Sequence, residues 1–138
     1  MFYDCQYRVS YGDTDQMGVV YYANYLELFE RGRTEMLRAA GISYKEMENR
    51  GIIFPVIEAF CKYHSSAFYD DLLTLRSYVS EIGRVKVKIC CEIYRGETLL
   101  VSGHVVLGSI NRDKRPQKLP QDFLDILHKY TLETSNEQ

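Results

Sequence analysis

Two aspartates, Asp13 and Asp15, are separated by one residue in the segment Y-G-D-T-D-Q-M-G, just before a predicted helix. A helix start carries free amide donors and a partial positive charge, so it favours an oxyanion or a polarised carbonyl. A carboxylate beside such donors is a minimal site for acyl transfer, because it joins a base or nucleophile to electrostatic stabilisation. The structural alternative for both residues is a role in the turn, since Asp commonly caps backbone amides there.

The helix that must position this loop is predicted from about Tyr22 to Ala40. Apolar residues recur along it at steps of three and four, as they do on one buried helical face. These residues are Tyr25, Leu26, Phe29, Met36, Leu37 and Ala40. On the other face, opposite charges three or four residues apart are predicted to pair. The predicted pairs are Glu27 with Arg31, Glu30 with Arg33, and Glu35 with Arg38. Gly18 is predicted to turn the chain into the helix and Gly41 to end it, because glycine tolerates left-handed backbone.

One continuous segment runs from the aspartate loop through the predicted helix: Y-G-D-T-D-Q-M-G-V-V-Y-Y-A-N-Y-L-E-L-F-E-R-G-R-T-E-M-L. Through this segment the chain resembles the 4-hydroxybenzoyl-CoA thioesterase family of hotdog-fold proteins, which includes acyl-CoA thioesterases linked to the Tol–Pal system. Further matches follow in order at P-V-I-E-A, Tyr63, Y-D-D-L-L, R-P and L-P, so that similarity extends from about Tyr7 to about Leu127. The resemblance implies an α+β hotdog fold, with an antiparallel sheet of about five strands wrapped round one long central helix. It also implies a homo-oligomer, expected as a dimer of dimers, with the active site between two subunits.

The resemblance assigns a catalytic role to Asp15, the second aspartate of the motif. It implies that the Tyr22 amide donates to the thioester oxygen and that Gly18 admits the substrate close to the backbone. Two routes stay open: Asp15 attacks the thioester carbon to form a mixed anhydride, or it activates water as a general base. Enzymes of the Tol–Pal type often carry His where this chain has Tyr22, whereas the hydroxybenzoyl type carries an aromatic residue there. The acyl specificity is therefore not fixed by the motif.

Substrate-binding roles are also implied by the resemblance. Asn24 belongs to the motif itself, and Glu58 lies on a strand expected near the subunit interface, either as a pocket acid or as an exposed strand residue. Arg84 falls where the family holds the phosphates of coenzyme A, and Arg112 and Arg115 are candidates for the same nucleotide end. Arginine suits bidentate contact with phosphate, although solvated surface charge is the alternative for each of these residues.

Composition limits the classes of partner. The chain has 138 residues and a formal net charge of -2, which gives no indication of general affinity for nucleic acid or acidic membranes. No apolar run approaches the ~20 residues of a membrane span, and the N-terminal residues do not read as a signal peptide, so a cytoplasmic location is expected. The four cysteines form no C-x-x-C pair and are expected as reduced thiols. The histidines lack the spacing of metal ligands, so we expect no metal and no cofactor beyond the coenzyme A of the substrate.

The remaining segments predict one domain over residues 1–132 and a polar tail over 133–138. Strands are predicted at residues 2–10, 54–63, 73–79, 85–93 and 99–110, joined by connections of hairpin length in the second half. A capping box at Ser43 and Glu46 predicts a short helix that ends by Gly51, and residues 123–132 predict a terminal helix. Gly103 and Gly108 are expected to mark bulges.

Together these features predict an acyl-CoA thioesterase that hydrolyses a short-chain or aromatic acyl-CoA with Asp15. The alternative is a non-catalytic acyl-CoA-binding or regulatory hotdog protein, which would bind the same ligands without turnover. A hotdog dehydratase fits less well, because it would require a histidine at the helix entry, where this chain has none.

Overall fold

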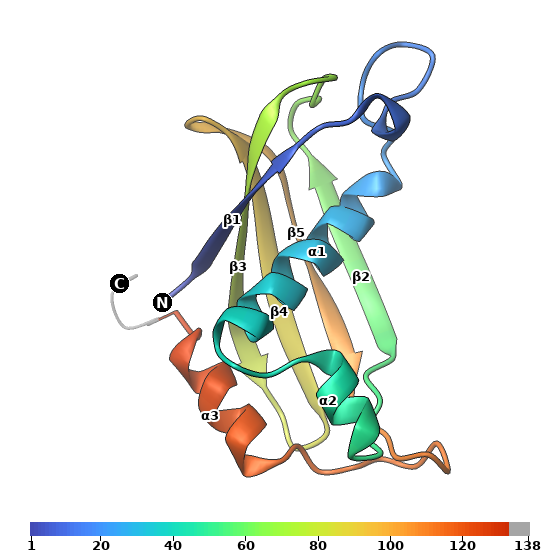
Figure 1. Cartoon of the computed structure of the whole chain (residues 1–138), viewed down its shortest axis with the longest axis vertical. Helices are drawn as coiled ribbons and strands as arrows, with labels where there is room; N and C mark the ends of the chain where they lie inside the picture. The colour runs from blue at the N-terminus through green and yellow to red at the C-terminus, as the bar shows by residue number, and fades with distance from the viewer. Residues whose placement is uncertain (133–138) are drawn as a thin grey trace.

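A computed structural model describes residues 1–132. Five strands form one antiparallel sheet in the order β1-β3-β4-β5-β2 (Figure 1). The strands are β1 (Tyr3–Arg8), β2 (Val56–Tyr63), β3 (Leu72–Ile82), β4 (Lys86–Arg95) and β5 (Thr98–Gly108). The helices are η1 (Tyr11–Asp13), α1 (Asn24–Ala39), α2 (Tyr44–Asn49) and α3 (Gln121–Lys129). The predicted α+β class and antiparallel sheet are confirmed, the single-domain boundary stays a prediction, and the predicted tail lies outside the described residues.

The 16-residue helix α1 crosses one face of the sheet (Figure 1). Its buried residues are Tyr25, Leu28, Phe29, Gly32, Arg33, Met36 and Leu37. Leu26 was expected in this stripe, but it is 39% exposed; Leu28 lies there instead, three residues after Tyr25 on the same side of the helix. Gly32 lets α1 approach β3 closely, since a Cβ there would lie 2.8 Å from Ser77 Oγ.

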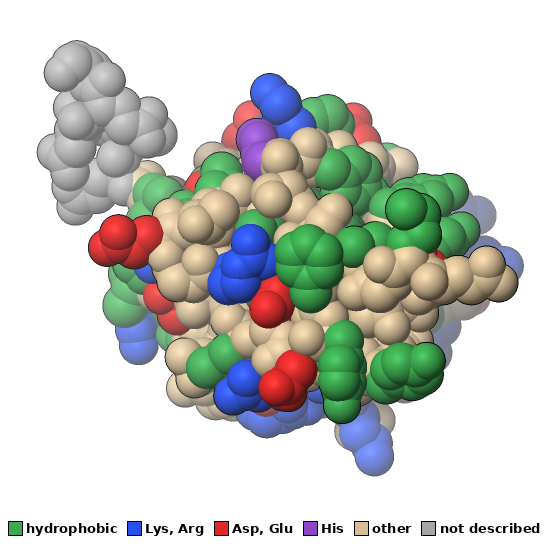
Figure 2. Space-filling view, turned by 90° about the horizontal axis from the view of Figure 1, so that it is seen from above, with side chains coloured by type: hydrophobic (Ala, Val, Ile, Leu, Met, Phe, Trp, Pro, Cys, Tyr) green, Lys and Arg blue, Asp and Glu red, His purple; other side chains and the backbone are tan. Residues whose placement is uncertain are grey.

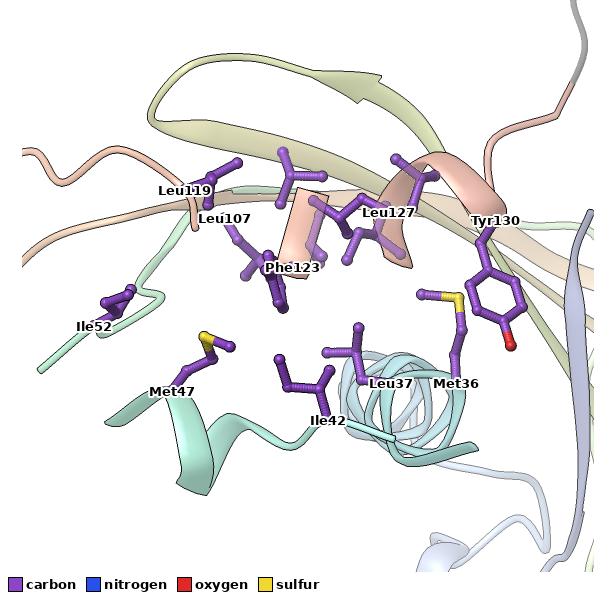
Figure 3. Close-up of a cluster of buried hydrophobic side chains, with 14 residues drawn as sticks. Met36, Leu37, Ile42, Met47, Ile52, Leu107, Leu119, Phe123, Leu127 and Tyr130 are labelled. Atoms are coloured by element: carbon purple, nitrogen blue, oxygen red, sulfur yellow. The ribbon is translucent and has the colours of Figure 1, made fainter. Parts of the chain in front are cut away.

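Two clusters of buried side chains hold the sheet to its helices. One joins the first half of α1 to β3, β4 and β5. The other joins the second half of α1 to α2, α3 and the opposite end of the sheet (Figure 3). In this second cluster Met36 and Leu37 of α1 meet Met47 of α2 and Phe123 of α3. Helix α2, which follows α1, and helix α3, which follows β5, therefore close the same end of the molecule. The start of α1 lies at the opposite end.

The charged face of α1 differs from the sequence prediction. Among residues 1–132, Arg38 and Glu35 form an ion pair, whereas neither of the other two expected pairs is found. Arg33 was predicted to pair with Glu30, but it lies on the buried side of the helix and is 7% exposed. Its Nε and Nη1 atoms have no hydrogen-bond acceptor among the described residues. The three-residue spacing allowed a pair between Glu30 and Arg33, but the helix turns the Arg33 guanidinium inward, so the prediction of this pair is wrong.

Local signals in the second helix and in β5 are partly confirmed. Ser43 Oγ accepts a hydrogen bond from the Glu46 amide at 3.1 Å, while the Glu46 carboxylate pairs with Arg50 at 2.9 Å instead of returning to the cap. Gly108 lies beside a bulge in the neighbouring strand, between Val56 and Glu58.

Gly103 was expected to mark a bulge, but it lies in regular register opposite Cys61 and Cys91. A Cβ there would lie 2.0 Å from the Phe60 carbonyl oxygen and 2.8 Å from Phe29 Cε2. Glycine is therefore required by close packing rather than by an irregular strand.

Candidate active site

The loop between η1 and α1 contains a small hairpin that presents Asp15. Thr14 and Val20 form an antiparallel bridge, and the Asp15 amide donates to the Val19 carbonyl at 2.9 Å. The Gly18 amide donates to the Asp15 carbonyl at 3.1 Å, and Gly18 has a φ of +78°. A turn closed by a left-handed residue is a common three-residue hairpin loop, and it favours glycine at that position. The predicted turning role of Gly18 is thus confirmed.

Asp13 anchors this loop rather than lining a cleft. Its Oδ2 accepts hydrogen bonds from the Tyr7 hydroxyl at 2.6 Å and the Ser10 amide at 2.9 Å. Burial raises the pKa of Asp13, but hydrogen bonds from Tyr7 and Ser10 outweigh it and hold the pKa below its usual value. Asn24, predicted to bind substrate, donates its side-chain amide to the Asp13 carbonyl at 2.9 Å and so ties the loop to the first turn of α1.

Asp15 and Tyr22 line one cleft of about 360 Å³ at the start of α1. The Asp15 carboxylate is exposed, and its Oδ1 accepts from the Met17 amide at 2.8 Å; no partner of Oδ2 is found among the described residues. The Tyr22 amide likewise has no acceptor there, and the helix cap at Ala23 has no side-chain hydrogen bond. A residue with an open carboxylate oxygen and a residue with an unused amide donor therefore line one cleft.

Aromatic side chains that the sequence did not assign to the site form walls of this cleft. The rings of Tyr22 and Tyr63 meet edge to face with centroids 6.4 Å apart, and those of Tyr25 and Tyr63 lie 5.6 Å apart. Tyr63 also donates its hydroxyl to the Tyr22 carbonyl at 3.2 Å. The cleft is completed by Val19, Val20, His64, Ser65 and Ser66. The sequence placed Tyr63 at the end of a predicted strand. Its position in the cleft follows only from the packing of the end of β2 beside the start of α1.

Glu58 lies on the opposite face of the sheet. It pairs with Val106, whereas the β5 residues that face α1 include Val105 and Leu107. Its Oε2 is 2.8 Å from His104 Nε2, and its side chain is 62% exposed. Within one protomer it therefore does not meet the cleft that holds Asp15.

The three arginines expected at the nucleotide end lie at the other end of the sheet from Asp15 (Figure 1). Arg84 follows β3, while Arg112 and Arg115 lie in the loop after β5. Arg112 donates to the carbonyls of Glu48 and Asn49 at 3.3 Å, which secures the end of α2. One protomer alone does not bring these side chains to Asp15.

Apolar and aromatic side chains gather on the side of the molecule that carries β2. Figure 2, a view from above Figure 1, shows hydrophobic residues concentrated on the right, where β2 and the Asp15 loop lie in Figure 1. Over the described part of the chain, no group of His, Cys, Asp and Glu is placed to hold a metal ion, and no helix is long and apolar enough to cross a membrane.

Comparison with known proteins defines the class. The thioesterase-like superfamily matches residues 9–127, so the chain belongs to that family. The structure is similar to that of a probable thioesterase from Bartonella henselae, with 36% identity, a TM-score of 0.83, and coverage of 87% of this chain and 100% of the other. The hotdog-fold resemblance is thereby confirmed, and the protein is a thioester hydrolase.

Two curated relatives carry more specific names. The acyl-CoA thioester hydrolase YbgC of Escherichia coli O6:H1 is 32% identical over 119 residues, covering 85% of this chain and 89% of the relative. The 1,4-dihydroxy-2-naphthoyl-CoA hydrolase of Nostoc punctiforme is 30% identical over 123 residues, covering 86% and 82%. Both similarities span nearly the whole hotdog domain rather than the motif alone.

Proposed function

We propose that this protein hydrolyses a short-chain or aromatic acyl-CoA to the free acid and coenzyme A, with Asp15 as nucleophile or general base. In this proposal α1 is the central helix of the hotdog fold, and its start supplies the Tyr22 amide as the oxyanion donor. The observation that carries the proposal is the shared cleft, which is lined both by Asp15, whose Oδ2 has no partner among the described residues, and by Tyr22, whose amide has no acceptor there. The names of the two curated relatives support an acyl-CoA as substrate.

The chemistry requires only these two groups and water. In the nucleophilic route, Asp15 Oδ2 bonds to the thioester carbon, the C–S bond breaks, and its electron pair leaves on the coenzyme A thiolate. Water then cleaves the mixed anhydride and restores the carboxylate. In the general-base route, Oδ2 takes a proton from water as the water oxygen attacks the same carbon, and the tetrahedral intermediate then collapses with cleavage of the C–S bond and departure of the coenzyme A thiolate. In both routes the Tyr22 amide stabilises the oxyanion of the tetrahedral intermediate.

We propose a dimer formed through β2, as the resemblance implies. The strand lies at one edge of the sheet and exposes apolar side chains on both faces. These are Val56, Ile57, Phe60 and Tyr63, which are 52%, 62%, 51% and 48% exposed. An unpaired edge of this kind favours pairing with another strand. Antiparallel pairing about a two-fold axis places the start of β2 in one protomer beside the end of β2 in the other.

Such a pairing would bring the loop of Arg112 and Arg115 from one protomer toward the Asp15 cleft of its partner. Phosphates of coenzyme A would then meet arginines that lie far from Asp15 within a single chain. A dimer of dimers remains our proposal for the full assembly. Free thiols at all four cysteines suit a reducing compartment, and we propose the cytoplasm.

Single-turnover assays with acetyl-, hexanoyl-, palmitoyl-, benzoyl- and 4-hydroxybenzoyl-CoA test the proposal. We expect hydrolysis of at least one thioester, and a rate lower by about a thousandfold in Asp15→Asn with little change in ligand affinity. Asp125→Asn on α3 is the matched control, because Asp125 is an exposed carboxylate far from the cleft. Binding without turnover by the unmodified protein would instead establish an acyl-CoA-binding protein, and full activity in Asp15→Asn would remove Asp15 from the mechanism.

A further inference from the structure

Three residues of the edge strand β2, Glu58, Phe60 and Lys62, lie on the face of the sheet that points away from α1. The intervening Cys61 packs against the buried cluster beneath α1, so Phe60 and Lys62 point to the other side. The ring of Phe60 stacks on that of His104, with centroids 5.5 Å apart and an angle of 21° between the planes. This face of β2 therefore carries an acid, an aromatic ring and a base in steps of two residues, and we call it the Glu58–Lys62 row.

The two charged ends of this row do not pair with each other. They lie about 13 Å apart along the strand, with Phe60 between them. Glu58 Oε2 is 2.8 Å from His104 Nε2, and the Glu58 side chain is 62% exposed. Lys62 forms no ion pair among residues 1–132. Within the part of the chain that the structure describes, the row therefore ends in an unpaired ammonium and a carboxylate that is mostly open to solvent.

The backbone of β2 limits how another strand can pair with this edge. The His64 amide donates to the Leu100 carbonyl of β5 at 2.8 Å. Since residues that exchange hydrogen bonds alternate along an antiparallel ladder, the three residues of the row also direct their backbone groups toward β5. The residues between them direct theirs to the free edge, and these are Ala59, Cys61 and Tyr63. A second β2 must therefore pair through these odd-numbered positions.

Charge separates the registers that this backbone pattern allows. Because both partners use odd-numbered positions, the two-fold axis passes at a residue, which then lies opposite its own copy. With the axis at Phe60, Glu58 lies opposite Lys62 of the partner subunit, and this contact occurs twice. With the axis at Glu58 or Lys62, like charges lie opposite each other, which is destabilising. With the axis at Ala59 or Cys61, Lys62 lies opposite no carboxylate.

We propose that the Glu58–Lys62 row is a self-complementary surface through which two copies of this chain recognise each other, with Phe60 at the two-fold axis. The inference rests on the β2 dimer of the proposed function and adds the residues that set its register. Glu58 of each protomer pairs with Lys62 of the partner subunit, and the two Phe60 rings lie side by side between these ion pairs. Because the row is exposed, it selects the register more than it adds affinity.

His104 prepares the row for this contact. Its imidazole stacks on Phe60 and lies within hydrogen-bond distance of Glu58 Oε2, so it limits the rotamers of both side chains before the partner binds. Among residues 1–132 no hydrogen bond reaches Glu58 Oε1. This second carboxylate oxygen is the acceptor for the ammonium of Lys62 of the partner subunit.

Exchange of the two charges tests the pairing. Glu58→Lys and Lys62→Glu each place like charges opposite each other twice, so each should raise the dimer dissociation constant by at least about tenfold. The double variant restores opposite charges in reverse order, and its constant should return to within about threefold of that of the unmodified protein. Analytical ultracentrifugation at low ionic strength measures the constants, because salt screens exposed ion pairs.

Lys88→Glu is the matched control. Lys88 alternates with the buried Val87 and Ile89 on β4, so it faces the same side as the row but lies two strands away from the edge. Its dissociation constant should stay within about twofold of that of the unmodified protein. A double variant that dimerises as weakly as the single variants would overturn the inference, because a second charge change cannot reverse a loss of packing or of the contact with His104.

Introduced cysteines test the register directly, in proteins that also carry Cys61→Ala and are oxidised with diamide. Phe60→Cys places each thiol opposite its own copy, where the Cα atoms of such a pair lie about 4.5 Å apart, a separation that a disulfide spans. We expect a disulfide-linked dimer from this variant. Lys62→Cys should give none, because its two copies would lie at least about 13 Å apart.

The outcomes separate this inference from the proposed function. A linked dimer from Lys62→Cys, or one linked through Cys61 in the unmodified protein, would show a different register and overturn the inference while leaving a β2 dimer in place. A monomeric unmodified protein would contradict both the inference and the β2 dimer. Absence of turnover with every thioester would contradict the hydrolase proposal alone, since the register does not depend on it.

Discussion

The two ends of β2 present opposite states of hydrogen bonding. At its end beside Tyr63, the loop that carries Asp15 is anchored: Asp13 accepts from Tyr7 and Ser10, and Asn24 ties the loop to α1. At its start beside Val56, the buried Arg33 Nε and Nη1 and the Tyr44 hydroxyl have no hydrogen-bond partner among residues 1–132. The comparison shows that hydrogen bonds hold the loop at one end of β2, whereas packing at the other end buries polar groups that no hydrogen bond among the described residues satisfies.

Disrupting the proposed β2 dimer should have the largest effect. Phe60 is 51% exposed on the edge strand, and Phe60→Glu would place like charges across the two-fold axis and near Glu58. Repulsion of several kcal/mol is expected, which raises the dimer dissociation constant by about a thousandfold. Thioesterase activity should fall with the dimer fraction and recover as protein concentration rises. Sedimentation and activity are measured over the same concentration range.

The matched control is Phe2→Glu, because Phe2 is a 43% exposed aromatic residue next to β1, at the opposite edge of the sheet. It should leave the proposed β2 dimer intact. A monomeric Phe60→Glu protein that keeps full activity would contradict the proposal that the active site needs two subunits.

The contact between β5 and the middle of β2, at Gly103 of β5, should be the next most sensitive position. In Gly103→Ala the new Cβ would lie 2.0 Å from the Phe60 carbonyl oxygen, which belongs to the backbone and cannot rotate away. Overpacking of this kind is expected to lower the free energy of unfolding by about 3 kcal/mol, measured by urea denaturation. Gly12→Ala is the control, since no atom lies within 4 Å of a Cβ there. Equal stability of the two variants would show that β2 can move away from β5 at little cost in free energy, and that close packing at Gly103 does not hold β2 in place.

Local sequence signals predicted most of the fold because they depend on neighbouring residues. Alternation along residues 85–93 and the turn at Gly96 gave β4 and its hairpin, and the S-x-x-E pattern at Ser43 gave the start of α2. The bulge at Ile57 was not predicted, because its signal depends on the partner strand. A proline and a run of apolar residues there fit a regular strand equally well.

The candidate site was likewise predicted where its residues are neighbours in the sequence, and missed where they meet only through packing. Asp15, Gly18 and Tyr22 lie within one short segment, and the structure places Asp15 and Tyr22 on one cleft. The inward turn of Arg33 was missed, since an arginine three residues after a glutamate is normally a surface pair. Tyr44 was likewise treated only as a helix residue. Both depend on how α1, α2 and β2 pack together, which no local pattern encodes.

The smallest expected effect is on stability, at Asp13, which anchors the loop that carries Asp15. The pKa of Asp13 is held below its usual value of 3.8, so its contribution to stability is complete above about pH 5 and is lost as the pH falls through the folded-state pKa. Asp13→Asn should therefore be less stable than the unmodified protein by about 1 kcal/mol at pH 7, because Tyr7 and Ser10 lose a charged acceptor. The difference should shrink as the pH falls toward 3. Urea denaturation at both pH values measures it, with Asp125→Asn as the control, and a difference that grows on acidification would mean that Asp13 does not act as a charged anchor for the loop.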